Sequence, residues 1–163
     1  MKHLIAPLNA TGLAMIFTIA ASLTALTATA ATRTWDGGGT DENWATSANW
    51  NPNGTPVSGD TLVFDLDWGR TTNNLAANTA FTLRLTSGGN DIYGNRIKLN
   101  GLYTVNAGTL ANRNASNIIN LDLSLNTDVV HESLGGNECW IKGDVDLNTH
   151  TLTFSNYSYG YSY

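Results

Sequence analysis

Apolar and polar residues alternate in short segments along most of the chain, a pattern that predicts β-strands. The clearest segment is residues 60–65, in which Leu62 and Phe64 fall on one face of the strand. Similar pairs recur at nearly equal spacing along the chain: Leu62/Phe64, Leu83/Leu85, Tyr103/Val105, Leu123/Leu125 and Val145/Leu147. A second series recurs at a similar spacing: Ile97/Leu99, Ile119/Leu121 and Ile141/Gly143.

Two interleaved series with the same period are typical of a solenoid, because each coil must stack on a neighbour to bury its narrow apolar face. Asn and Gly lie at the expected corners, for example in residues 88–90 and 106–108. These residues tolerate left-handed backbone geometry, and Asn side chains can stack as amide ladders. We therefore predict an all-β fold whose coils span residues 60–155. An antiparallel β-sandwich, in which strands and turns also alternate regularly, is the alternative.

A tryptophan-rich segment, residues 34–50, precedes the predicted coils and contains too many turn-forming residues for a helix or a long strand. It carries three of the five tryptophans of the chain, namely Trp35, Trp44 and Trp50. Because each indole buries about 200 Å² when it is covered, we expect these rings to pack over the open end of the coils. Residues 31–59 are therefore predicted to form an N-terminal cap.

Residues 1–30 have the pattern of a secretory signal peptide. A short basic start is followed by an apolar run over residues 13–26, which is too short to cross a bilayer as a helix. Residues 28–30 then form a small-x-small cleavage site, so we expect cleavage after Ala30. The predicted mature chain is secreted, or displayed on the outer cell surface, and has no membrane span.

The low content of charged residues and the negative net charge bear on which partners the protein can bind. Charged residues make up only 13% of the chain, the net charge is −5, and no Lys/Arg cluster is present. Phosphate-backbone binding needs concentrated positive charge, so a nucleic-acid partner is not expected. The single cysteine, Cys139, leaves no intramolecular disulfide to stabilise the fold.

Several stretches resemble the start of the bacterial autotransporter-associated β-strand repeat proteins, a family of secreted passenger-type repeat proteins. These stretches are TRTWDGGGTDENWATSANW at residues 32–50, SGDTLVF at 58–64, INLDLSL at 119–125 and GDVDLNTHTLTFS at 143–155. The resemblance implies a right-handed parallel β-helix that is secreted and displayed at or beyond the outer cell surface. Members are usually far longer, so we interpret the chain as an N-terminal fragment of a passenger. We interpret its tyrosine-rich tail, residues 156–163, as a truncated end.

Candidate catalytic or metal-binding groups are few. Two Asp-x-Asp pairs, Asp65/Asp67 and Asp144/Asp146, place both carboxylates of a pair on one face of a strand, where they could hold Ca²⁺ or act in a polysaccharide lyase. Acids on the outer face of a strand are equally what solubility requires. His131 and His150 lie at no recognisable metal spacing, and Cys139 has no nearby base in the sequence. We therefore predict no metal site, no cofactor and no enzymatic activity.

The predicted function is that of a structural or adhesive surface protein. The alternative is a carbohydrate-binding β-domain that uses exposed tryptophans, for which Trp44, Trp50 and Trp68 are the candidates. In either case the expected partner is a surface glycan or another component of the cell envelope.

Overall fold

The computed structural model describes residues 29–65, 69–105, 116–134 and 139–157. One sheet, here called sheet A, contains nine strands: β1 (Thr32–Trp35), β2 (Trp50–Asn51), β3 (Thr61–Phe64), β5 (Thr79–Leu85), β7 (Ile97–Val105), β9 (Leu123–Leu125), β10 (Val129–Leu134), β12 (Val145–Asp146) and β13 (Leu152–Tyr157). Sheet B contains β4 (Gly69–Asn73), β6 (Asn90–Gly94), β8 (Asn117–Ile119) and β11 (Cys139–Ile141). A single turn of 3-10 helix, η1 (Ser47–Asn49), precedes β2.

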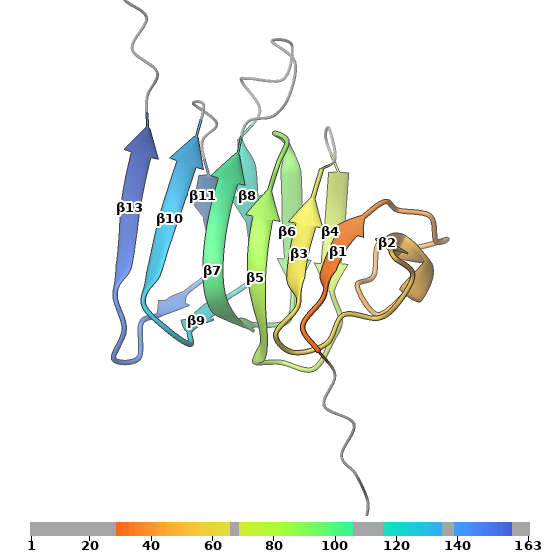
Figure 1. Ribbon diagram of the computed structural model, residues 1–163, viewed down its shortest axis with the longest axis horizontal. Coiled ribbons are helices and arrows are strands. Elements are labelled where there is room, and N and C mark those ends of the chain that lie inside the picture. Colours follow the sequence, from red (N-terminus) through yellow and green to blue (C-terminus); the bar gives the residue numbers. More distant parts are fainter. Residues whose placement is uncertain (1–28, 66–68, 106–115, 135–138, 158–163) are drawn as a thin grey trace, which may run out of the picture.

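The chain runs along sheet A, crosses to sheet B and returns, so that the two sheets face each other around a shared core (Figure 1). Successive strands within each sheet pair in parallel, and these stacked coils form a β-solenoid of about three turns. Among the described strands only β1 and β2 pair antiparallel. The predicted parallel solenoid is therefore confirmed, and the antiparallel sandwich is wrong.

The core is built from side chains that repeat at the same position of each coil. In sheet A, Leu62 pairs with Leu83 and Leu83 with Leu102, and all three are fully buried. In sheet B, Ile92 pairs with Ile119, and both side chains are fully buried. Because side chains on a strand alternate between faces, every second residue enters the core and those between face the solvent. The spacing predicted between the first two apolar pairs is thus confirmed, since β3 and β5 place them side by side.

The prediction that Tyr103 points into the core is wrong, because a bulge changes the alternation within β7. Phe81 pairs with Leu99, but the next residue, Thr82, pairs with Gly101. The extra residue shifts the inward positions by one, so Leu102 is buried and Tyr103 is 37% exposed.

The second predicted series is only partly correct. Ile119 pairs with Ile141 at the expected interval. Ile97, however, lies in sheet A and pairs with Leu123. The residue that precedes Ile119 in its own sheet is Ile92. The interval between β6 and β8 is longer than the average period, so a regular spacing assigned Ile97 to the wrong sheet.

Polar residues also stack between coils, as predicted for the asparagines. Asn90 and Asn117 are buried, and Asn90 Nδ2 donates to Asn117 Oδ1 at 2.8 Å. In the same sheet Asn73 Nδ2 donates to the carbonyl oxygen of Asn95 in the following coil at 2.7 Å. These bonds satisfy the Nδ2 groups of Asn73 and Asn90, whereas Asn90 Oδ1 and Asn117 Nδ2 are buried without a partner among the described residues.

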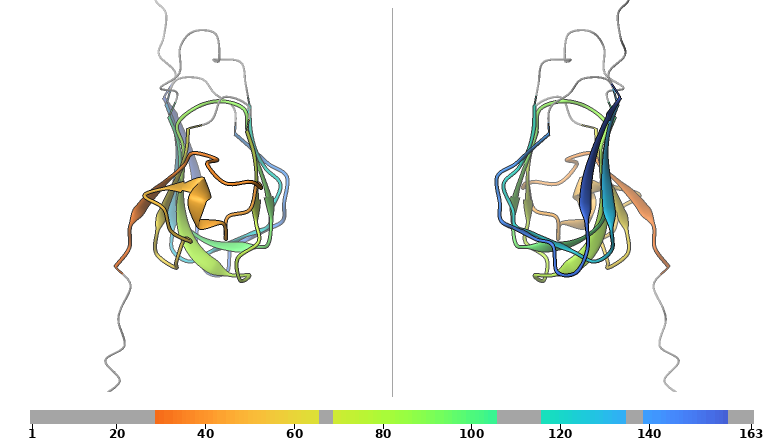
Figure 2. Two further views of the ribbon diagram at one scale, coloured as in Figure 1. Left: turned by 90° about the vertical axis from the view of Figure 1, so that its right-hand side faces the viewer. Right: turned by 90° about the vertical axis from the view of Figure 1, so that its left-hand side faces the viewer.

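The tryptophan-rich segment closes the N-terminal end of both sheets, and Figure 2 shows it crossing that end of the coils. On sheet A, Trp50 of β2 pairs with Trp35 of β1. On the sheet B side, the backbone N–H of Trp44 donates to the carbonyl of Thr72 at 2.9 Å. Trp35 is 3% exposed and the other two indoles 0%. The expectation that these rings cover the end of the coils is confirmed.

The Gly-rich turn before Trp44 is fixed by the buried side chain of Asn49. Its Nδ2 donates to the carbonyls of Asp41 and Asn43, and its Oδ1 accepts from the N–H of Gly39. A Cβ at Gly39 would meet Asn49 Oδ1 at 2.5 Å, so this position requires glycine for a close approach. The turn is therefore a structural support of the cap.

The C-terminal end of the solenoid is uncovered among the described residues. One ladder of inward positions runs from Leu102 through His131 to Phe154. The exposed fractions along this ladder are 0%, 4% and 61%. Phe154 lies on β13, which in the described part of the chain pairs only with β10. The two ends of the solenoid therefore differ: one is sealed and the other presents core positions and a free strand edge.

We predict that Trp44→Ala lowers the free energy of unfolding by about 3–5 kcal/mol, because it removes a fully buried indole and leaves a cavity. Trp140→Ala is the matched control: that indole is 52% exposed, so the expected change is within about 0.5 kcal/mol. Urea denaturation of both variants measures the difference. Equal stability of the two variants would contradict the capping role.

Candidate functional site

The structure rejects two of the three tryptophans expected to bind sugar. Trp44 and Trp50 are 0% exposed and contact each other edge to face, with ring centroids 6.1 Å apart. Their N–H groups are also used internally, because Trp44 Nε1 donates to Thr71 Oγ1 and Trp50 Nε1 donates to the carbonyl of Trp44. The prediction that they form an exposed stacking platform is therefore wrong. Trp68 lies outside the described residues.

The Asp-x-Asp pairs do not converge on a described cluster. Asp144 and Asp146 are both exposed, and Asp146 Oδ1 accepts from the N–H of Asn148 at 2.9 Å. Asp65 accepts a hydrogen bond from Thr86 Oγ1 at 2.9 Å, while Asp67 lies outside the described part of the chain. Within residues 29–65, 69–105, 116–134 and 139–157, no three His, Cys, Asp or Glu side chains gather in a way that could hold a metal ion.

The carboxylate of Asp41 is likewise occupied by the cap itself. It accepts from the N–H of Asn43 at 3.0 Å and from Thr46 Oγ1 at 2.9 Å. These bonds, first that to the Asn43 backbone, lower the pKa of Asp41 from its ordinary value. The turn has the acidic, Gly-rich composition of a cation loop, but this carboxylate serves to hold the turn together.

His131 is buried, and Cys139 is partly buried against the core. Burial raises the pKa of Cys139 to about 12, so its thiol stays protonated at neutral pH and is a poor nucleophile. His131 accepts or donates through Nε2 to Thr104 Oγ1 at 3.1 Å, while its Nδ1 is buried without a partner among the described residues. Burial lowers the pKa of His131, so the neutral imidazole is favoured.

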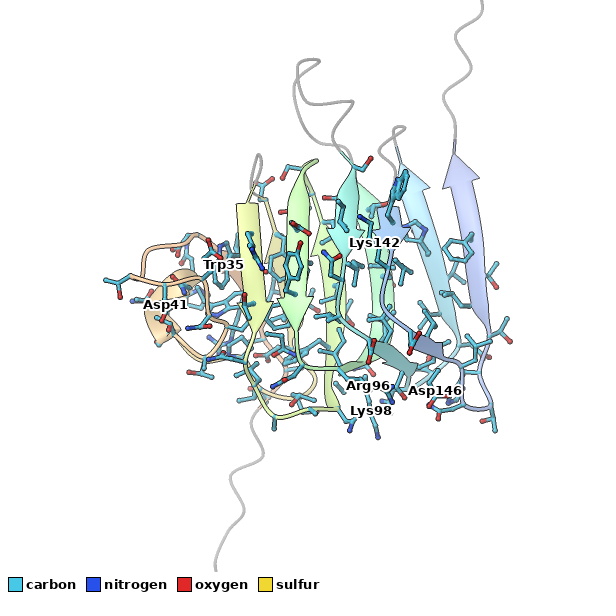
Figure 3. The ribbon with its side chains drawn as sticks, turned by 180° about the vertical axis from the view of Figure 1, so that it is seen from behind. Trp35, Asp41, Arg96, Lys98, Lys142 and Asp146 are labelled. Carbon is cyan, nitrogen blue, oxygen red and sulfur yellow. The ribbon has the colours of Figure 1, made fainter. Side chains whose placement is uncertain are left out.

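The outer face of sheet B carries the most distinctive exposed group of side chains. Figure 3 views the molecule from this side, with Lys142 on the outer face. Because Ile92, Ile119 and Ile141 point into the core, the residues that flank them point outward. We call six outward residues of this sheet the sheet B face: Asp91, Tyr93, Asn120, Trp140, Lys142 and Arg70, which pairs with Asp91 on the neighbouring strand.

Four of these residues form a connected chain across neighbouring coils. Arg70 Cζ lies 4.1 Å from the centroid of the Tyr93 ring, a cation–π contact. Tyr93 Oη donates to Asp91 Oδ2 at 2.9 Å, and Asn120 Nδ2 donates to Asp91 Oδ1 at 2.6 Å. The hydrogen bond to Asp91 raises the pKa of Tyr93, because only the protonated phenol can donate this bond to the carboxylate. Asp91 thus holds the two neighbouring side chains in place.

Trp140 is a second aromatic residue on the same face, and Lys142 lies beside it. The Trp140 indole is 52% exposed, and Lys142 Nζ lies 5.9 Å from its ring centroid. An indole face beside hydrogen-bonding side chains can stack on the C–H face of a sugar ring while its neighbours bind hydroxyl groups.

The alternation of residues around Ile141 is a sequence signal for part of this face. Trp140 and Lys142 flank Ile141, which had been assigned to the core series, so alternation alone places both side chains outside. The Asp91–Tyr93–Asn120 contacts were not predictable in this way, because they depend on which strands are neighbours.

Comparison with known proteins gives no family assignment. The chain matches no family model, no curated protein and no solved structure. No helix in the described part of the chain is long and apolar enough to cross a membrane. A functional proposal therefore rests on the sequence, the fold and the sheet B face.

We predict that acid destabilises the protein partly through His131. The unfolded imidazole has a pKa of about 6.5, and burial lowers the folded value, so the unfolded state binds the proton first as the pH falls. The free energy of unfolding should therefore decrease as the pH drops below about 6.5.

Urea denaturation between pH 7.5 and pH 5 measures this slope. His131→Leu should flatten it, because leucine at this buried position has no group that takes up a proton. An identical slope in wild type and His131→Leu would show that this imidazole does not contribute.

Proposed function

We propose that this chain is a secreted or cell-surface structural module with an adhesive role and no catalytic activity, formed by the first coils of a passenger-type β-solenoid. The signal-peptide pattern of residues 1–30 and the resemblance of residues 32–50 to autotransporter-associated repeat proteins support this proposal. The stacked parallel coils are consistent with it, since a solenoid makes a long, regular surface from short repeats.

The observation that carries the proposal is the difference between the two ends. Trp35, Trp44 and Trp50 are buried at the N-terminal end, whereas Phe154 is 61% exposed at the other. An exposed core position beside the free edge of β13 is suited to receive another coil of the same kind. A module that is sealed at one end and open at the other suits growth in one direction.

A second candidate function is carbohydrate binding on the sheet B face, with a surface glycan as the ligand. The specific observation in its favour is the half-exposed indole of Trp140, which lies on the same face as Tyr93 and Asp91. This candidate keeps the class of ligand expected from the sequence and replaces the buried residues Trp44 and Trp50 by an exposed one.

The passenger proposal predicts that the DNA beyond the codon for Tyr163 encodes further β-strand repeats, in the same or another reading frame. It also predicts that the chain, expressed with residues 1–30 in a Gram-negative host, is recovered outside the cytoplasm. Sequencing of the locus and cell fractionation test these two expectations. Retention of the intact chain in the cytoplasm would overturn the proposed secretion.

The carbohydrate-binding candidate predicts that a glycan changes the intrinsic tryptophan fluorescence of the protein. Trp35, Trp44 and Trp50 are buried and Trp140 is half exposed, so the change is expected from Trp140 and should disappear in Trp140→Ala but persist in Trp68→Ala. Tyr103→Ala is a matched control, because Tyr103 is an exposed aromatic residue on sheet A. If no glycan on an array bound the protein and the fluorescence did not change, carbohydrate binding would be contradicted and the structural role would be the one remaining proposal.

A further inference from the structure

Asp60 is a fully buried carboxylate at the start of the first coil, and it accepts hydrogen bonds from Ala31 and Arg33, near the start of the described residues. Its exposed fraction is 0%. The backbone nitrogen of Ala31 donates to Oδ1 at 2.8 Å, while Arg33 Nε donates to Oδ2 at the same distance. The N–H of Val57 also donates to Oδ2, at 3.0 Å. A buried carboxylate that already accepts three N–H groups is a preformed acceptor for charged nitrogen donors.

The donor at Oδ1 belongs to the residue that follows the predicted cleavage site. In the uncut chain, the nitrogen of Ala31 is an amide that carries one hydrogen and no charge. Hydrolysis of the Ala30–Ala31 bond by a signal peptidase adds one water molecule. Ala30 leaves with a carboxylate, and Ala31 keeps its nitrogen as an amine that takes up a proton at neutral pH. The same nitrogen then carries a positive charge.

We propose that removal of residues 1–30 creates an ion pair between the new α-ammonium group of Ala31 and the buried carboxylate of Asp60, so that processing stabilises the folded domain. This inference rests on the proposed secretion. The pair replaces a hydrogen bond in which only the carboxylate is charged by one in which donor and acceptor both carry charge, and this bond is stronger, particularly where solvent is excluded.

The surrounding backbone keeps Ala31 in position after the leader is removed. The N–H of Thr61 donates to the carbonyl of Ala31 at 2.8 Å, and β1 then continues in parallel register, with Thr32 opposite Thr61. Cleavage therefore frees the nitrogen of Ala31 without releasing its carbonyl. The pair would tie the first residue of the mature chain to the first residue of the predicted coils.

The test compares two proteins that differ only in the charge at this nitrogen. A chain beginning at Ala31 retains every described strand, since β1 begins at Thr32, and it can be released from a fusion by a protease that leaves no extra residue. The second protein is the same chain with its α-amino group acetylated. We expect the unfolding equilibrium constant of the free-amine form to be smaller by at least about 5-fold, measured by urea denaturation at pH 6.5.

Two further measurements make the result specific to Asp60. In Asp60→Asn, the difference between the free and acetylated chains should vanish, and an undiminished difference would overturn the inference. If Asp60→Asn does not fold, the inference is tested by the pH dependence of the stability difference between the free-amine and acetylated forms of the wild-type chain. Among the described residues, the Ala31 nitrogen contacts the carboxylate of Asp60, which also pairs with the guanidinium group of Arg33.

A carboxylate partner raises the pKa of the α-ammonium group above its ordinary value of about 7.7–8.0. The stabilisation is therefore complete below that range and is lost as the pH rises through the folded-state pKa. A difference between the two chains that is absent at pH 6.5, or that does not change up to pH 10, would overturn the inference.

N-terminal sequencing of the exported protein separates this inference from the proposed function. A mature chain that begins at Ala31 supports both. Export with cleavage at another bond would overturn the ion pair in the natural protein and leave the proposed secretion intact. A chain that is never exported would overturn the proposed secretion, and the comparison of free and acetylated chains would still measure the strength of the pair.

Discussion

Each coil of this solenoid has an apolar face that only a neighbouring coil can cover, and the structure depends on how that requirement is met at the first coil. Leu62 and Phe64 pair with the following coil, but the described residues contain no preceding coil of the regular kind. The three indoles of the tryptophan-rich segment supply the missing surface, with Trp44 and Trp50 packing against Phe64 at centroid distances of 5.4 and 5.8 Å. The cap therefore substitutes for a coil, and the coils that follow stack on a surface that is already closed.

Much of the fold was accessible from the sequence because a regular repeat leaves a regular pattern. The pairing of Leu62 with Leu83 follows directly from the spacing of the apolar pairs. The bulge in β7 could not be found in this way, because both alternations through residues 97–105 contain apolar residues. Pairing with β5 selects Leu102 for the core and leaves Tyr103 at the surface.

The candidate site was less predictable for a similar reason. Trp44 and Trp50 lie in an irregular segment without periodicity, so the sequence does not indicate which way their rings point. Trp140 lies in a strand, where alternation does indicate its direction. The contacts that join Asp91 to Tyr93 and Asn120 arise only when β6 and β8 lie side by side, and the long stretch of chain between these two strands hides this from a local pattern.

The two ends of the solenoid differ in how their apolar faces are closed. Asp60 binds Arg33 from β1 and the N–H of Ala31, so the segment that closes the end of the solenoid is also fixed at its first residue. The opposite end has no equivalent closure in the described chain, and Phe154 remains exposed beside a strand edge. Stability should therefore be distributed unevenly, greatest near the cap and least at β13.

Native-state hydrogen exchange tests this central claim most directly, because it reports the free energy of opening for individual backbone amides. If the tryptophan cap anchors the fold, amides of β3 and β5 should exchange only through global unfolding, and protection should decline towards β10 and β13. Protection that is uniform along the solenoid, or greatest at β13, would contradict this account.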